Sequence, residues 1–182
     1  MENMNRKPSQ IIVLKNMQIP YNTDTWQPRN FRGLERVKNG RIVNSEGSRN
    51  FVLFLDPEQV DCEKLIEDGW NITKRENPTD PQEAPSYTLR VKVKYHPENS
   101  DLVRLNPKVR VVNASGSEME MDEANVGDLD NMQIQKANIT LRATWQVTPT
   151  YTGYVAYLSK IVVRAYEESG SMDELMEGIF DD

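Results

Sequence analysis

The chain has 182 residues, of which 37% are hydrophobic and 27% are charged, a composition typical of one soluble domain. No apolar stretch approaches the roughly 20 residues that span a bilayer, and the polar N-terminus lacks the apolar segment of a signal peptide. Cys62 is the single cysteine, which excludes a disulfide framework, so we expect a cytoplasmic protein without membrane contact.

The formal net charge of −6 hides an uneven distribution along the chain. Residues 167–182 contain seven acids and no base, and removing them leaves a body with net charge +1. Residues 118–130 hold six more acids and no base, and without them the rest of the body has a net charge of about +7. We therefore expect a flexible arm over residues 1–10, a polyanion-binding domain over 11–166 and an acidic interaction tail over 167–182.

Strand signals dominate the first third of the chain. Residues 11–19 predict a first strand, which Pro20 ends. The dipeptide Asn39-Gly40 predicts a hairpin turn between two short strands. Residues 51–55 are an unbroken apolar run, too short for a helix, and predict a central strand buried on both faces.

One helix follows this central strand. Asp56 stands where an N-cap belongs, and Pro57 occupies the first helical position, where its missing N–H costs nothing. Residues 58–68 carry enough apolar side chains for two to three turns, and Gly69 supplies the C-cap. An extended segment is expected to resume at Trp70.

The clearest alternation in the chain covers residues 87–95. Tyr and aliphatic side chains occupy one face of the predicted strand, whereas Arg90, Lys92 and Lys94 occupy the other. A loop with three prolines precedes it, over residues 76–86. The strand therefore presents a row of cations away from the core, unless those charges serve only to solvate an edge strand.

Two more strands close the domain. Residues 137–148 alternate between apolar and polar side chains, and residues 154–166 return as the last strand, while residues 114–130 are acidic and irregular with one helical turn near 122–126. About seven strands, one short helix and no helix–strand alternation predict an all-β fold, a small antiparallel Greek-key barrel that is OB-fold-like.

Aromatic rings accompany the cations at several places in the chain. Single-stranded nucleic acid requires this combination, because bases stack on rings while phosphates contact Lys and Arg. We therefore predict a nucleic-acid-binding face, and assign Trp70 and Trp145 to the core because they lie on apolar faces. The predicted binding residues are Trp26, Arg29, Phe31, Arg32, Arg49, Arg90, Lys92, Lys94, Arg104, Lys108, Arg110, Arg142, Tyr151 and Tyr154.

The acidic tail carries apolar side chains that a solubilising tail does not need. Acid next to an apolar side chain suits docking on a basic partner with an apolar pocket, although an inert tail is an equal alternative. The tail also suits occupation of the chain's own cationic face. The predicted partner-binding residues are Leu175, Met176, Ile179, Phe180, Asp181 and Asp182.

Catalytic and cofactor signals are weak. Cys62 and His96 lie far apart in the sequence without a third group, which argues against a nucleophile–base pair. A zinc site needs about four nitrogen or sulfur ligands, and no phosphate-cradling glycine motif is present. We expect no enzyme activity, no metal and no cofactor.

Several short motifs resemble a family of bacteriophage single-stranded DNA-binding proteins. They are Arg49-Asn50-Phe51, Phe54-Leu55-Asp56-Pro57, Asp68-Gly69-Trp70-Asn71 and the alternating strand that starts at Tyr87. The acidic tail with Phe180 near its end is also similar to the tails of such proteins, although two aspartates follow the phenylalanine here. The resemblance implies an OB-fold, sequence-independent binding of single-stranded DNA, a role in phage replication or recombination in the host cytoplasm, and protein partners recruited by the tail. It leaves self-association into a homo-oligomer open.

Two other functions compete with this interpretation. The acidic blocks suit an inhibitor that imitates DNA and occludes a host DNA-binding enzyme, an activity that should depend on residues 118–130 rather than on Arg90, Lys92 and Lys94. A nuclease with paired carboxylates is the third alternative, and incubation of labelled DNA with Mg²⁺ or Mn²⁺ distinguishes it.

Overall fold

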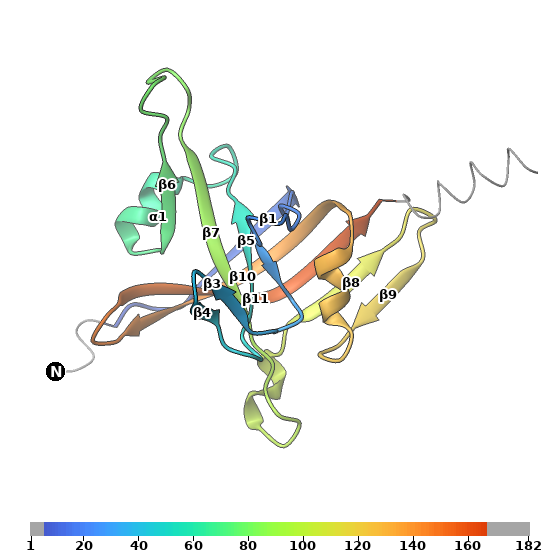
Figure 1. The fold of residues 1–182 in the computed structure, drawn as a ribbon. Coiled ribbons are helices and arrows are strands. Elements are labelled where there is room, and N and C mark those ends of the chain that lie inside the picture. The colour runs from blue at the N-terminus through green and yellow to red at the C-terminus, as the bar shows by residue number, and fades with distance from the viewer. Residues whose placement is uncertain (1–5, 167–182) are drawn as a thin grey trace, which may run out of the picture.

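The computed structural model describes residues 6–166 (Figure 1). Within that range it contains strands, one α-helix and two 3₁₀-helices. In chain order they are β1 (Gln10–Met17), β2 (Arg29–Asn30), β3 (Arg36–Lys38), β4 (Arg41–Asn44), β5 (Arg49–Phe54), α1 (Cys62–Asp68), β6 (Ile72–Arg75), β7 (Ser86–Val93), η2 (Asp101–Leu105), β8 (Lys108–Val112), β9 (Glu118–Met121), η3 (Val126–Asn131), β10 (Ile134–Val147) and β11 (Thr152–Ala165).

One large sheet forms most of the domain, and β11 pairs with three of its other strands, β10, β7 and β8. The strand order is β1-β10-β11-β7-β5-β2, with β6 paired to β7 and the β8–β9 pair attached to β11. Most pairings are antiparallel, but β7 and β8 both run parallel to β11 and pair with its successive halves. The hydrogen-bonded path among the described strands does not close on itself. The all-β prediction with one short helix is confirmed, in the form of an open, mixed sheet.

The predicted strands match the structure closely where the alternation is regular. On β7, Tyr87, Leu89, Val91 and Val93 are buried, and the cationic side chains between them are exposed. The hairpin at Asn39-Gly40 also forms, and both residues have positive φ (53° and 74°), as a tight two-residue turn requires. Burial of alternate side chains therefore sets the facing of β7, whereas the turn at Asn39-Gly40 sets the hairpin.

The helix begins later than the sequence predicts. Asp56 accepts a hydrogen bond from the N–H of Glu58 in a turn, and α1 starts only at Cys62, with Asp61 accepting from the N–H of Lys64 as the N-cap. Two acids five residues apart both suit a helix start, and the first one closes a turn instead. Gly69 ends the helix in the left-handed conformation, as predicted.

One expectation about a shorter element is wrong. Residues 118–121 were expected to be irregular but form β9, paired to β8. The expected turn near 122–126 forms, with the N–H groups of Asn125 and Val126 donating to the carbonyl of Asp122, and η3 follows it directly. Residues 101–105 form η2. In β9 the alternation of Glu and Met follows strand periodicity, and acidic composition masked this signal.

Gly69 also holds the α1 end against the β10–β11 hairpin. Its φ is 108°, and a Cβ at this position would lie 2.8 Å from Cζ3 of Trp145. We expect Gly69→Ala to lower the free energy of unfolding by about 1–3 kcal/mol, because the alanine Cβ clashes with Trp145 and alanine adopts this positive φ only with strain. Denaturant unfolding monitored by circular dichroism measures this loss.

Gly116→Ala is the matched control for Gly69→Ala. Gly116 has a similar φ of 88°, but a Cβ there would meet no atom within 4 Å. The control therefore reports the backbone strain alone, about 1 kcal/mol. Equal losses for the two variants would contradict the predicted clash with Trp145.

The described residues include no helix that is both long enough and apolar enough to cross a lipid bilayer.

Candidate nucleic-acid interface

The register of the sheet aligns side chains from five strands in one row on its outer face. Arg142 of β10 lies between Ile11 of β1 and Tyr157 of β11, and Tyr157 lies beside Lys92 of β7. Lys92 in turn pairs with Asn50 of β5. Because paired residues of neighbouring strands project to the same face, these five side chains form a continuous stripe across the sheet.

Two adjoining pockets follow this stripe. The larger has a volume of about 670 Å³ and is lined by backbone and side chains of Val43, Asn44, Ser45, Gly47, Ser48, Arg49, Asn50, Arg90, Lys92, Val93, Lys94, Tyr95, Glu123 and Tyr157. The smaller has a volume of about 320 Å³ and extends toward the β10–β11 hairpin, with Arg90 and Lys92 lining both pockets. We call the two together the groove. Four predicted binding cations, Arg49, Arg90, Lys92 and Lys94, therefore lie in one place.

Arg90 lines both pockets of the groove and is held there by a chain of amides. Its Nη1 donates to Oδ1 of Asn50 at 2.6 Å, and Nδ2 of Asn50 donates to Oδ1 of Asn44 at 3.3 Å. Although the residue is exposed, partial desolvation by the surrounding protein lowers the pKa of Arg90 below its ordinary value. Since an arginine pKa lies far above neutrality, the guanidinium stays charged and is positioned by its neighbours.

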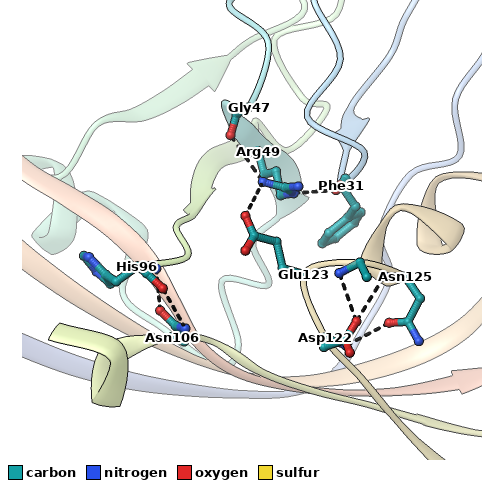
Figure 2. A network of polar contacts seen from close by, with 9 residues as sticks. Phe31, Gly47, Arg49, His96, Asn106, Asp122, Glu123 and Asn125 are labelled. Atoms are coloured by element: carbon teal, nitrogen blue, oxygen red, sulfur yellow. Dashed lines mark hydrogen bonds and ion pairs between the residues drawn. The ribbon is translucent and has the colours of Figure 1, made fainter. Parts of the chain in front are cut away.

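Arg49 also lines the larger pocket, and it takes part in a network of polar contacts (Figure 2). Its Nε donates to the carbonyl of Phe31 at 3.1 Å, and its Nη1 lies 3.6 Å from a carboxylate oxygen of Glu123. The guanidinium also covers the ring of Tyr95, 5.5 Å from the centroid. Burial is the main reason that the pKa of Tyr95 rises to about 12, and its buried hydroxyl has no hydrogen-bond partner among residues 6–166.

Tyr157 is a groove residue that the sequence prediction missed. Arg142 lies over its ring, 5.4 Å from the centroid, and Nε2 of Gln146 donates to its hydroxyl at 2.9 Å. These contacts hold the ring in place at the wall of the larger pocket. Alternation along the last strand carried the signal, because Tyr157 faces opposite to the buried Tyr154 and Ala156.

A pair of aromatic rings, Trp26 and Phe54, lies on the same outer face, farther along β5. Trp26 is 43% exposed and packs edge-on against Phe54, itself 42% exposed, with ring centroids 6.0 Å apart. Phe54 was expected to be buried, but it pairs with Thr88 and follows Asn50 and Val52 on the outward side of β5. The outer face therefore offers rings at two positions, with Arg90 and Lys92 between them.

Arg29 and Phe31 do not belong to the groove, and their predicted role there is wrong. Arg29 is 1% exposed, and its guanidinium donates four hydrogen bonds to the carbonyls of Ile19, Pro20, Leu129 and Met132. Phe31 is fully buried and stacks on Phe51, with centroids 5.0 Å apart. Rings and cations close together in the sequence thus serve the core here, since β2 pairs with β5 and buries the segment.

The two tyrosines of the β10–β11 hairpin both line the smaller pocket but differ in burial. Tyr154 is 1% exposed and packs against Trp70 and Trp145, so most of its ring belongs to the core. Tyr151 is half-buried and lines the smaller pocket, with its hydroxyl donating to the carbonyl of Tyr154 at 2.7 Å. Trp70 is buried in the core as predicted, and Trp145 is half-buried against it.

The remaining predicted cations lie outside the groove lining. Arg32 is exposed on the loop after β2, and Arg104 is exposed on η2. Lys108 and Arg110 lie on β8, where Arg110 makes ion pairs with Glu118 at 3.5 Å and Glu120 at 3.7 Å. Lys108, Arg110 and Lys160 line a separate pocket. The structure therefore does not gather these four predicted residues with Arg90 and Lys92.

The acids of residues 118–130 are largely occupied by internal contacts. Glu118 and Glu120 pair with Arg110, and Glu123 pairs with Arg49. Asp130 is buried and accepts the backbone N–H groups of Phe31 and Arg32 at 2.8 and 3.1 Å. An imitation of DNA requires a row of free carboxylates, so these contacts favour the cationic face as the binding surface.

Within residues 6–166, no three His, Cys, Asp or Glu side chains come together as metal ligands. The predicted tail residues, Leu175 to Asp182, lie outside the described range.

Comparison with known proteins gives a family. The family model described as "Putative phage ssDNA-binding domain" matches residues 8–169. No curated protein matches the chain. Among solved structures, the chain is similar to the single-stranded DNA-binding protein from bacteriophage Enc34 in complex with ssDNA, at 11% identity over 85% of this chain and 86% of that chain (TM-score 0.45).

Two further solved structures are similar. A C-terminal truncation of the bacteriophage Enc34 protein has 11% identity over 85% of each chain (TM-score 0.47). The single-stranded DNA-binding protein gp2.5 encoded by bacteriophage T7 has 7% identity over 87% of each chain (TM-score 0.38). Because the family model spans most of the sequence, this chain belongs to the phage single-stranded DNA-binding domain family.

Proposed function

We propose that this chain binds single-stranded DNA, without sequence preference, along the groove on the outer face of β10, β11, β7 and β5. Phosphates contact Lys92, Lys94, Arg90 and Arg49, and bases stack on Tyr157 and on the Trp26–Phe54 pair. The observation that carries the proposal is the register-aligned stripe, which puts the ring of Tyr157 between Arg142 and Lys92, with Tyr157 and Lys92 both lining the larger pocket. Rings support binding to every base, because each base has a stacking face.

The direct test is a salt-titrated binding curve with fluorescently labelled oligo-dT, compared with duplex DNA of the same length. We expect tight binding of the single strand, weak binding of the duplex, and an affinity that falls steeply with salt. Equal affinity for both forms, or no binding at 50 mM salt, would contradict the proposal. The acidic tail competes for cations, so a chain ending at residue 169, where the family match ends, is measured beside the full chain.

Lys92→Gln should weaken binding to every sequence. It should also reduce the slope of log affinity against log salt concentration (the salt slope) by about 0.7, since one phosphate contact on a single strand is lost. Lys92 is exposed at the junction of the two pockets. The control is Lys64→Gln on α1, which removes the same charge outside the groove lining. A slope that stays unchanged in Lys92→Gln would exclude a phosphate contact at this position.

The proposed role is the covering of transient single strands during phage replication or recombination in the host cytoplasm. In that setting the apolar and acidic side chains of the tail, Leu175, Met176, Ile179, Phe180, Asp181 and Asp182, dock on replication or recombination proteins. Self-association into a homo-oligomer is compatible with this role. Pull-down from a phage-infected lysate with the full chain and with the chain ending at residue 169 tests the docking.

A further inference from the structure

Among the described residues that line the groove, Glu123 is the one acid, and the other charged residues are all cations. It is part of the loop between β9 and η3, and it lines the same pocket as Arg49, Arg90, Lys92 and Lys94. Its side chain is 58% exposed and reaches Nη1 of Arg49 at 3.6 Å (Figure 2). An acid at this position opposes binding of a polyanion, so its presence calls for an explanation.

The loop is built to hold Glu123 in this position. Asp122 accepts the backbone N–H groups of Ala124 and Asn125 at 2.9 and 3.2 Å, and Asn125 accepts the N–H of Asp122 at 2.8 Å (Figure 2). Val126, next in the chain, is fully buried. A turn that is closed on both sides of Glu123 and anchored in the core fixes the backbone of this residue within reach of Arg49, while its carboxylate stays more than half exposed and can move.

Arg49 is fixed as firmly from the opposite side. Its side chain is 16% exposed, its Nε donates to the carbonyl of Phe31 at 3.1 Å, and its Nη1 lies 3.4 Å from the carbonyl of Gly47. The guanidinium therefore cannot swing away from the carboxylate. A phosphate that reaches Arg49 has to displace Glu123 or share the guanidinium with it.

We propose that Glu123 is an affinity-setting residue, which occupies Arg49 in the free protein and is displaced by a phosphate of the bound strand. This inference rests on the proposed function. Displacement breaks the Arg49–Glu123 ion pair and leaves the carboxylate to recruit a cation from solution, which offsets part of the counterion release that the Arg49–phosphate contact provides. The consequence is weaker binding that is also less dependent on salt.

The test is the affinity of E123Q for oligo-dT over a range of salt concentrations. We expect binding about two- to fivefold tighter at low salt, in line with an exposed ion pair, and a salt slope steeper by up to about 0.7. E58Q is the charge-matched control, because Glu58 lies on the turn before α1, outside the groove lining, and its substitution should change the affinity less than E123Q does.

A double-mutant cycle with R49Q separates the specific contact from general repulsion. If Glu123 acts through Arg49, E123Q in the R49Q background gains no more affinity than E58Q does in that background. A full gain in the R49Q background, or no gain of E123Q over E58Q in the wild-type background, overturns the inference. If R49Q does not fold, the comparison of E123Q with E58Q still decides it. Failure of the wild-type chain to bind oligo-dT refutes the proposed function itself, and the inference falls with it.

Discussion

Replacing Arg29 with methionine is expected to lower the free energy of unfolding by about 3–5 kcal/mol. Arg29 is 1% exposed, and its guanidinium donates to four backbone carbonyls, at 2.6 to 3.0 Å. Methionine fills a similar volume but leaves those carbonyls without their donor, inside the protein. It also removes the positive charge near the buried carboxylate of Asp130.

The charge of Arg29 is expected to persist at neutral pH. Burial lowers its pKa to about 10, while the carboxylate of Asp130 opposes that change, so the guanidinium remains protonated near pH 7. The loss in Arg29→Met therefore includes an uncompensated anion as well as missing hydrogen bonds. Urea unfolding followed by circular dichroism and tryptophan fluorescence measures it.

Arg32→Met is the matched control for Arg29→Met. Arg32 is exposed three residues further along, and it contributes a backbone N–H to Asp130 that the substitution preserves. We expect a change within about 0.5 kcal/mol, as for other surface substitutions. If Arg29→Met lowers the free energy of unfolding by less than 1 kcal/mol, the guanidinium does not stabilise the packing of η3 against residues 19–29.

The second large effect is expected on binding. Tyr157→Ala should weaken the affinity for oligo-dT by about 5- to 150-fold, which corresponds to the roughly 1–3 kcal/mol that a stacked base contributes. Tyr157 lies in the stripe between Arg142 and Lys92, so truncation removes a ring and also frees Arg142 from its contact. Fluorescence anisotropy at several salt concentrations measures the loss, and the salt slope should stay nearly constant because no charge is removed.

Tyr157→Phe and Tyr166→Ala are the controls for this prediction. Phenylalanine keeps the ring and loses only the hydrogen bond from Gln146, so we expect most of the affinity to remain. Tyr166 is 50% exposed just after the end of β11, away from the groove lining, and its truncation should leave binding unchanged. Equal losses in Tyr157→Ala and Tyr157→Phe would argue for a hydrogen-bonding role instead of stacking.

Local signals predicted much of the fold because regular alternation depends only on near neighbours in the chain. The β7 pattern placed Tyr87, Leu89, Val91 and Val93 in the core, and Asn39-Gly40 placed a hairpin. The helix start was wrong because Asp56 and Asp61 both suit an N-cap, and only packing of the whole chain selects one of them. Acidic β9 was missed because its acidic composition masked the alternation of Glu and Met, although its partner, β8, and its counter-charge, Arg110, lie just before it in the chain.

The candidate site was predicted most reliably where its residues follow one regular alternation. Arg90, Lys92 and Lys94 were found from alternation, whereas Arg29 and Phe31 looked similar in the sequence and are buried. Whether a ring or a cation faces solvent depends on how its segment packs in the fold. Arg29 lies on β2, and the pairing of β2 with β5 buries this segment. Tyr157 was missed because its role depends on Arg142 and Lys92, which lie on other strands.

The sequence by itself determined the all-β class, the Asn39-Gly40 hairpin, the cationic face of β7 and the division into a basic body and an acidic tail. These features follow from side-chain periodicity and from charge, which neighbouring residues define. The tertiary structure decided which rings and cations share a surface, and it set Glu123 against Arg49. The reason is physical: strand pairing brings distant residues together in register, and burial then withdraws some of them from solvent while leaving others exposed.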